Sequence, residues 1–212
     1  MDATQIADRI GRGLGVAARR IGLPHDLYRP AGPLRPLGPE QRVIRLHAAF
    51  NAESPGFTRP AGWGKVGRFG VFDTAYTRVG DYLYGPSGTF FIAAQDGLSP
   101  PLLVVCNRTL DLARTQPTQP RPGALAAGYA GGLQEQRLLE GWPASVIAAG
   151  GSGNGGPQTE LRRPGWTVLL PVLPVALRSG DRMTDDFGRT LIVQSAEQTA
   201  LGWRLAVSEP VL

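Results

Sequence analysis

The 212-residue sequence has no apolar run of membrane-spanning length, and it has one cysteine and two histidines. Its longest apolar stretches, such as residues 166–175, fall well short of the roughly 20 residues that a helix needs to cross a bilayer. Cys106 has no second cysteine to pair with, which excludes an internal disulfide and a cysteine-rich zinc site. The first residues lack the apolar core of a secretory signal, so we expect no export by the general pathway.

Lysine is almost absent: the 22 basic residues include only one lysine, Lys65. Arginine favours bidentate contacts with carboxylates and phosphates, although a GC-rich genome produces the same bias. The net charge of +5 is modest and the charges are scattered along the chain. We therefore expect passive contact with DNA at most, and no dedicated nucleic-acid binding.

Glycine and proline are abundant, with 29 and 19 residues. Together they make up nearly a quarter of the chain, against about an eighth in ordinary proteins. Such a composition favours many turns and short elements and argues against a helical bundle.

A repeat with a spacing of one hundred residues is the main architectural signal. Residues 78–93 align without a gap with residues 178–193, and arginine, glycine, aspartate and isoleucine coincide. In each copy a Gly-Asp turn, a short strand, a glycine-bearing turn and a β-rich returning strand predict a hairpin. The residues expected to shape these turns are Gly80, Asp81, Gly88, Gly180, Asp181 and Gly188.

A third strand follows each hairpin, at residues 102–107 and 202–207, and a partner strand precedes it, at residues 70–72 and 166–170. These patterns predict a mainly β fold with two tandem small antiparallel β-barrel or sandwich modules, an N-terminal helix and long Pro/Gly-rich arms. Two unrelated hairpins that share Gly-Asp by chance are the alternative.

The same patterns divide the chain. We expect an N-terminal helix over residues 1–24, a first β module with an extended arm over 25–112, a proline-rich linker over 113–124, and a second β module over 125–212. In the helix, Asp2 and Gln5 resemble a capping box, and Gly22 and Pro24 end the run. Its apolar positions are Ile6, Ile10, Leu14, Ala17 and Ile21.

Three segments are candidates for contacts between subunits: the helix, the proline-rich arm at residues 30–39 and the glycine-rich run at 150–156. An arm of this kind is also compatible with a plain surface loop, and the helix with docking on its own barrel. The residues we assign to intersubunit contacts are Ile6, Arg9, Ile10, Leu14, Pro33, Pro36, Ser152 and Asn154.

Catalytic patterns are sparse. His25 and His47 stand in no metal-binding spacing, and we expect a surface or capping role for the first and a strand position for the second. No Gly-x-Ser-x-Gly motif is present. Residues 11–15 superficially resemble a dinucleotide fingerprint, but no strand precedes them. The sequence therefore predicts no catalytic residue, no cofactor and no metal.

Acidic and aromatic clusters lead to the same expectation. Asp181, Asp185 and Asp186 lack the ligand spacing of a calcium loop, and Glu135 and Glu140 lie on an expected short helix without converging. The four tryptophans stand beside glycines, and we expect Trp166 and Trp203 to cover barrel ends. A carbohydrate-binding platform would require two or three of these rings on one open face.

A pattern of short strands and turns runs through the second half of the chain, at residues 165–170, 177–183, 186–193 and 201–205, with the Gly180-Asp181 turn before a short strand at its centre. This pattern resembles small β-barrel virion proteins of tailed bacteriophages. Head-tail joining proteins and related tail-tube modules carry this pattern in barrels that stack in rings. The whole chain also resembles uncharacterised phage-region proteins of GC-rich proteobacteria, on its Arg-Ile-Gly-Arg-Gly-Leu-Gly opening, the Gly80-Asp81-Tyr82-Leu83 turn and Asn107-Arg108.

This resemblance implies a virion structural protein that is assembled in the host cytoplasm, is not an enzyme and has itself and other virion proteins as partners. Joining proteins usually carry one barrel, whereas two are expected here. A neck component at the head-tail connection is one position, and a baseplate or tail-tip adaptor is the other. A glycan-binding module is the alternative from another class.

Overall fold

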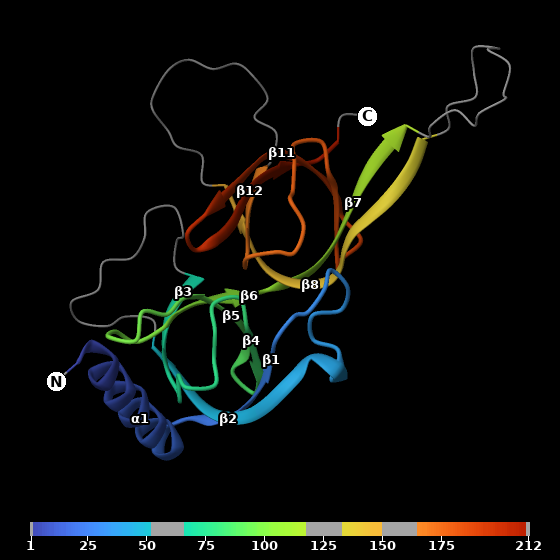
Figure 1. Ribbon diagram of the computed structural model, residues 1–212. Helices are drawn as coiled ribbons and strands as arrows, with labels where there is room; N and C mark the ends of the chain where they lie inside the picture. Colours follow the sequence, from blue (N-terminus) through green and yellow to red (C-terminus); the bar gives the residue numbers. More distant parts are fainter. Residues whose placement is uncertain (1, 52–65, 118–132, 150–164, 211–212) are drawn as a thin grey trace, which may run out of the picture.

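The structure, a computed structural model, describes residues 2–51, 66–117, 133–149 and 165–210. These residues form one N-terminal α-helix, a short 3-10 helix and twelve strands (Figure 1). The elements are α1 (Ala3–Ile21), β1 (Leu23–Tyr28), the short 3-10 helix η1 (Pro39–Gln41), β2 (Arg42–Asn51), β3 (Gly67–Val71), β4 (Tyr82–Gly85), β5 (Gly88–Ala94), β6 (Leu102–Cys106), β7 (Arg108–Pro117), β8 (Leu133–Ala148), β9 (Gly165–Leu170), β10 (Arg182–Asp185), β11 (Thr190–Thr199) and β12 (Gly202–Ser208).

The strands form two closed antiparallel barrels of six strands each. The order around the first barrel is β1-β2-β3-β6-β5-β4, and around the second it is β10-β11-β12-β9-β8-β7. Adding six to each strand number of the first barrel reproduces the second, so the two barrels have the same topology. The expectation of a mainly β chain with two tandem modules is confirmed, and the repeat extends over all six strands.

The boundary between the modules differs from the expected one. Only Asn107 separates β6 from β7, and β7 belongs to the second barrel. Residues 113–117 are not a linker, because they continue β7 and pair with β8. Proline is tolerated there because Pro117 lies at the very end of the strand. The rest of the expected linker, residues 118–124, lies outside the described residues.

The two hairpins also differ by one residue, which corrects the gapless alignment. Tyr82 pairs with Phe91, whereas Arg182 pairs with Ile192. The turn of the second hairpin is therefore one residue longer. Gly88 and Gly188 both adopt positive φ, at 112° and 76°, which explains why each turn requires glycine.

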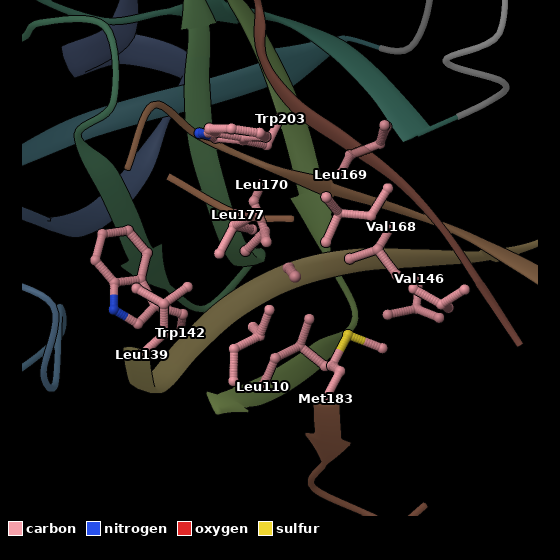
Figure 2. Packing of buried hydrophobic residues seen from close by; sticks show 14 of the residues in the cluster. Leu110, Leu139, Trp142, Val146, Val168, Leu169, Leu170, Leu177, Met183 and Trp203 are labelled. Carbon is pink, nitrogen blue, oxygen red and sulfur yellow. The ribbon is translucent and has the colours of Figure 1, made fainter. Parts of the chain in front are cut away.

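Alternation along each strand fills the barrel interiors. Leu83, Phe90, Ile92 and Leu103 belong to the core of the first barrel. In the second barrel, strands β8, β9, β10 and β12 bring Val146, Val168, Leu170, Met183 and Trp203 together (Figure 2). Both interiors are packed with aliphatic and aromatic side chains, which holds each barrel rigid.

The outer face of β4, β5 and β6 joins the first barrel to the second. Tyr82, Phe91 and Val104 are buried in one cluster with the second barrel's residues. The Tyr82 hydroxyl donates a hydrogen bond to the carbonyl oxygen of Pro143, at 2.8 Å, and its ring meets Trp142 edge to face. The two barrels thus share a continuous apolar contact instead of being connected by a flexible tether.

Candidate assembly surface

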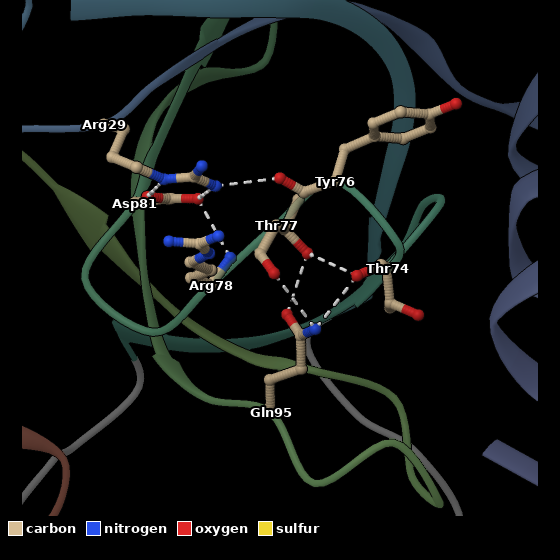
Figure 3. A network of polar contacts seen from close by, with 7 residues as sticks. All are labelled: Arg29, Thr74, Tyr76, Thr77, Arg78, Asp81 and Gln95. Atoms are coloured by element: carbon tan, nitrogen blue, oxygen red, sulfur yellow. Dashed lines mark hydrogen bonds and ion pairs between the residues drawn. The ribbon is translucent and has the colours of Figure 1, made fainter. Parts of the chain in front are cut away.

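The Gly-Asp turns predicted from the repeat carry the same polar cluster in both barrels. Asp81 accepts hydrogen bonds from the Nε and Nη2 atoms of Arg29, at 2.9 and 2.7 Å, and from the backbone N–H of Arg78. Nη2 of Arg29 also donates to the carbonyl oxygen of Tyr76 (Figure 3). The carboxylate of Asp81 is 3% exposed, so its charge is compensated by a bidentate arginine.

The second barrel repeats this cluster atom for atom. Asp181 accepts from the Nε and Nη2 atoms of Arg114, at 2.7 and 2.8 Å, and from the backbone N–H of Arg178. Nη2 of Arg114 donates to the carbonyl oxygen of Ala176. The preceding glycines, Gly80 and Gly180, adopt positive φ at 93° and 89°. We call these two clusters the Arg-Asp clamps.

The clamps fix the turn that leads into each short strand. Each joins the module's first strand to the turn before β4 or β10: Arg29 directly follows β1, and Arg114 lies within β7. The repeat predicts the aspartates and glycines of the clamps but neither arginine, because the arginines lie 52 and 67 residues away from their partners. Their spacing differs between the modules, so the repeat offered no alignment to find them.

The acidic cluster of the second hairpin also has a structural explanation. Asp185 accepts hydrogen bonds from the backbone N–H groups of Phe187 and Arg189 and from Nε of Arg189. Burial acts to raise the pKa of this carboxyl, but these hydrogen bonds and the Arg189 charge outweigh it and lower the pKa. Within the described part of the chain, no three His, Cys, Asp or Glu side chains are placed to hold a metal ion.

The two histidines do not share a site. His25 and His47 lie on the adjacent strands β1 and β2, but Leu46, not His47, is opposite His25. His47 is exposed, whereas His25 is 1% exposed and sits against the rings of Phe50 and Phe90. The expected surface or capping role for His25 is therefore wrong, because β1 begins at Leu23 and turns this side chain into the first barrel.

Inside the barrel, His25 has one satisfied ring nitrogen. Nδ1 lies 2.9 Å from the carbonyl oxygen of Leu23, while Nε2 has no hydrogen-bond partner among the described residues. Burial lowers the pKa of His25, against the opposing effects of the Leu23 carbonyl and the Asp26 charge. Burial also disfavours the charged form of Cys106: it raises the pKa of the thiol and so disfavours the nucleophilic thiolate.

The described tryptophans do not form an open platform. Trp142 and Trp203 are buried, at 1% and 6% exposure. Trp166 is partly exposed and lies beneath the guanidinium of Arg189. Trp63 lies outside the described residues. The arrangement of these three rings does not support the glycan-binding alternative.

The proline-rich arm packs on its own chain. The carbonyl oxygen of Pro33 accepts hydrogen bonds from the Glu140 backbone N–H and from Nε1 of Trp142. The backbone N–H of Arg35 returns a bond to the Glu140 carbonyl, so Leu34 forms a parallel bridge to β8. Pro36 is buried. These contacts tie the arm to the second barrel, and an intersubunit role for Pro33 and Pro36 stays a prediction, as it does for Ser152 and Asn154 outside the described residues.

The N-terminal helix is confirmed over Ala3–Ile21, although the Asp2 side chain makes no capping hydrogen bond. Helix α1 packs on β2 and β3 through its smallest residues: Gly11, Gly15 and Ala18 are buried. A Cβ atom on Gly11 would lie 2.5 Å from Oγ1 of Thr74. This close approach favours glycine at position 11, although glycine lowers the stability of the helix itself.

Docking through these small residues leaves much of the helix's apolar side uncovered. Ile6, Ile10, Leu14, Ala17 and Ile21 recur at helical spacing and form the surface that we call the isoleucine stripe. At about 100° per residue, the stripe lies about a quarter turn from the docked edge. Ile6 is 38% and Ile21 68% exposed. Arg9 and Arg20 border the stripe on the side away from the barrel.

No helix of the described residues is long and apolar enough to cross a membrane. Taken together, the described residues present an exposed apolar helix face on a rigid two-barrel body as their most distinctive surface. Comparison with protein-family models, with curated proteins and with solved structures finds no match to this chain.

Proposed function

We propose that this protein is a non-enzymatic structural component of a tailed-phage particle and forms part of the neck by ring assembly. The proposal starts from the resemblance of the second module to small virion barrels. The observation that carries it furthest is the joining of two barrels of one topology into a single body that exposes the isoleucine stripe. In this function the protein is a virion component that assembles in the host cytoplasm.

Closed barrels suit a load-bearing ring. Every strand of each barrel has two neighbours, so neither barrel offers an open sheet edge that would recruit strands at random. Association then depends on defined side-chain surfaces, as closed rings require. The stripe, with its large aliphatic side chains, supplies one such surface.

A baseplate or tail-tip adaptor is the second candidate, and the contact between the barrels favours it. Tyr82, Phe91 and Val104 fix the first barrel on the second, so each chain resembles two consecutive plates. An adaptor would bind a different neighbouring protein with each barrel, whereas copies of a neck protein would arrange their barrels in a ring around a DNA-sized lumen. The arginine-rich composition is compatible with passive phosphate contacts in the latter position.

The mass of the purified protein, measured by native mass spectrometry and by electron microscopy of the same sample, tests the proposal. A neck component should form closed rings of one copy number, alone or with the products of its neighbouring genes. A chain that binds such a product as a monomer supports the adaptor instead. A chain that stays monomeric with every one of these products contradicts both positions.

Incorporation into particles is the second test. Deleting residues 1–22 should abolish incorporation, because this segment carries the isoleucine stripe. Ile21→Glu serves as a milder variant, since the 68% exposed side chain leaves the barrel packing intact. Normal particles that contain the deleted chain at full occupancy would contradict the assembly role of the helix.

A further inference from the structure

The isoleucine stripe is an interaction surface whose partner can be described by its chemistry. Deepening the proposed assembly role, we infer that it binds an acidic amphipathic helix of a different protein. Such a helix would lay its apolar side on Ile6, Ile10 and Ile21 and place carboxylates beside Arg20.

The way that α1 docks is the first argument. An amphipathic helix ordinarily buries its apolar side against its own protein. Here the first barrel covers the helix edge formed by Gly11, Gly15 and Ala18, and the stripe residues Ile6 and Ile21 stay exposed beside it. Ile21, at 68% exposure, is among the most exposed large apolar residues of the described chain. The glycines permit this close docking, because a Cβ atom at position 11 would lie 2.5 Å from Oγ1 of Thr74 and one at position 15 would lie 3.1 Å from the Asp73 side chain.

Neighbouring apolar residues widen the surface. Leu23, which follows the helix, is 50% exposed, and Leu98 is 58% exposed. The loop that carries Leu98 lies beside the helix, since a Cβ atom on Gly97 would be 3.1 Å from that of Ala7. The helix has 19 residues and is about 28 Å long. A partner helix of about five turns therefore matches its length.

Charge complementarity selects the partner. The helical segment carries four arginines against Asp2 and Asp8. Within the described ranges, Arg12, Arg19 and Arg20 are exposed and have no ion-pair partner. A second copy of this helix would bring a second Arg20 to the same contact, and like charges disfavour that pairing. Asp and Glu side chains bordering the partner's apolar face would instead pair with Arg20.

A binding measurement on the full-length protein tests the inference. The probe is a fluorescent designed helix of 21 residues with leucine on one face and glutamate along its borders, and the control probe carries lysine in place of glutamate. Fluorescence anisotropy should show micromolar binding of the acidic probe, as expected for a small interface, and at least about tenfold weaker binding of the basic one. Equal binding of both probes would overturn the charge argument and the inference with it.

Variants locate the site. Ile21→Glu should weaken binding of the acidic probe about tenfold, and Arg20→Glu should weaken it by a similar factor. Val16→Glu is the matched control, because Val16 is 52% exposed on the same helix but lies outside the stripe. Circular dichroism and thermal unfolding establish that each variant is folded. An effect of Val16→Glu equal to that of Ile21→Glu would overturn the assignment.

The remaining occupants are outcomes of the same experiment. A dimer in sedimentation that Ile21→Glu abolishes, or binding to phosphatidylglycerol vesicles without binding to the acidic probe, would replace the proposed partner. Loss of Ile21→Glu from particles combined with no probe binding would retain the assembly role and reject the acidic helix. Binding of the acidic probe by a chain that is absent from every particle would reject the assembly role and retain the acidic helix as the partner.

Discussion

His25 in the first barrel stands where Leu110 stands in the second. Each lies two residues before a leucine, Leu27 or Leu112, that pairs with the short strand after the Gly-Asp turn. Both side chains are buried, at 1% and 0% exposure. The second barrel thus fills this position with an aliphatic side chain, while the first barrel holds an imidazole with an unpaired Nε2.

Replacing His25 with leucine should therefore stabilise the protein. The change removes a buried nitrogen without a partner, a burden of about 1 kcal/mol or more, and inserts the residue that the second barrel uses. Urea denaturation at pH 7 should show a higher midpoint for His25→Leu. His47→Gln on the exposed face of β2 is the control and should leave the midpoint unchanged. A lower midpoint for His25→Leu would contradict the equivalence.

The same residue predicts acid sensitivity. Because burial lowers the pKa of His25 in the folded state, the unfolded state binds a proton first as pH falls. This contribution to stability is complete above the unfolded pKa of about 6.5 and is lost as pH falls below it. Denaturation between pH 7.5 and 5 should show this loss in the wild type and a smaller one in His25→Leu. Identical pH profiles would exclude His25 as the cause.

The Arg-Asp clamps should contribute to stability in both barrels. Asp81→Asn and Asp181→Asn each remove the charge that holds a bidentate arginine and a turn N–H, at a cost of about 2 kcal/mol. The Arg114 side chain is 19% exposed against 32% for Arg29, so the second clamp is better shielded from water and Asp181→Asn should cost more. Urea denaturation provides both values, and Asp186→Asn, outside the clamps, is the comparison.

The barrel contact should determine whether the protein unfolds in one step. Tyr82 and Arg182 occupy equivalent positions in the two short strands, but Tyr82 is 0% exposed at the contact and Arg182 is exposed. Tyr82→Arg buries a charge against Trp142 and Pro143 and should separate calorimetric unfolding into two transitions. Arg182→Tyr should retain one transition. A single transition in Tyr82→Arg would mean that this contact does not couple the barrels.

Two glycines of α1 should respond in opposite directions. A Cβ atom on Gly13 would meet no other part of the molecule within 4 Å, so Gly13→Ala should stabilise the helix by about 1 kcal/mol. Gly11→Ala places its methyl group against Oγ1 of Thr74 and should lower the melting temperature despite the same gain in helix propensity. Thermal unfolding of the pair measures the difference. Equal shifts would indicate that the helix does not dock through Gly11.

The sequence predicted the strands that follow the Gly-Asp turns better than those that precede them. Periodicity, glycine turns and the repeat located β4, β5, β6 and their equivalents, because these signals are local. Strand β1 was missed because Pro24 directly follows the helix and appeared to belong to its exit. The prediction of a short helix at Glu135 and Glu140 is wrong, because both residues lie in strand β8. The bulges in β8 interrupt the alternation of apolar and polar residues that would have predicted a strand.

The candidate surface was predictable only in part. Spacing identified the isoleucine stripe, but not that the glycines would form the docked edge, because that depends on Thr74 and Asp73 far along the chain. The arginines of the clamps could not be predicted either, because their partners also lie far along the chain. Contacts between residues distant in sequence leave no periodic signal, and a repeat reveals them only where both copies keep the same spacing.

Asn107, the single residue between the last strand of one barrel and the first of the next, leaves no slack in the chain. Its side-chain amide donates to the carbonyl oxygen of Val146 and accepts from the same residue's N–H, at 2.9 and 2.8 Å, while its own N–H donates to Ala144. A force applied to one barrel would therefore be transmitted to the other without first extending a linker. Under mechanical tension the two barrels would move as one rigid body.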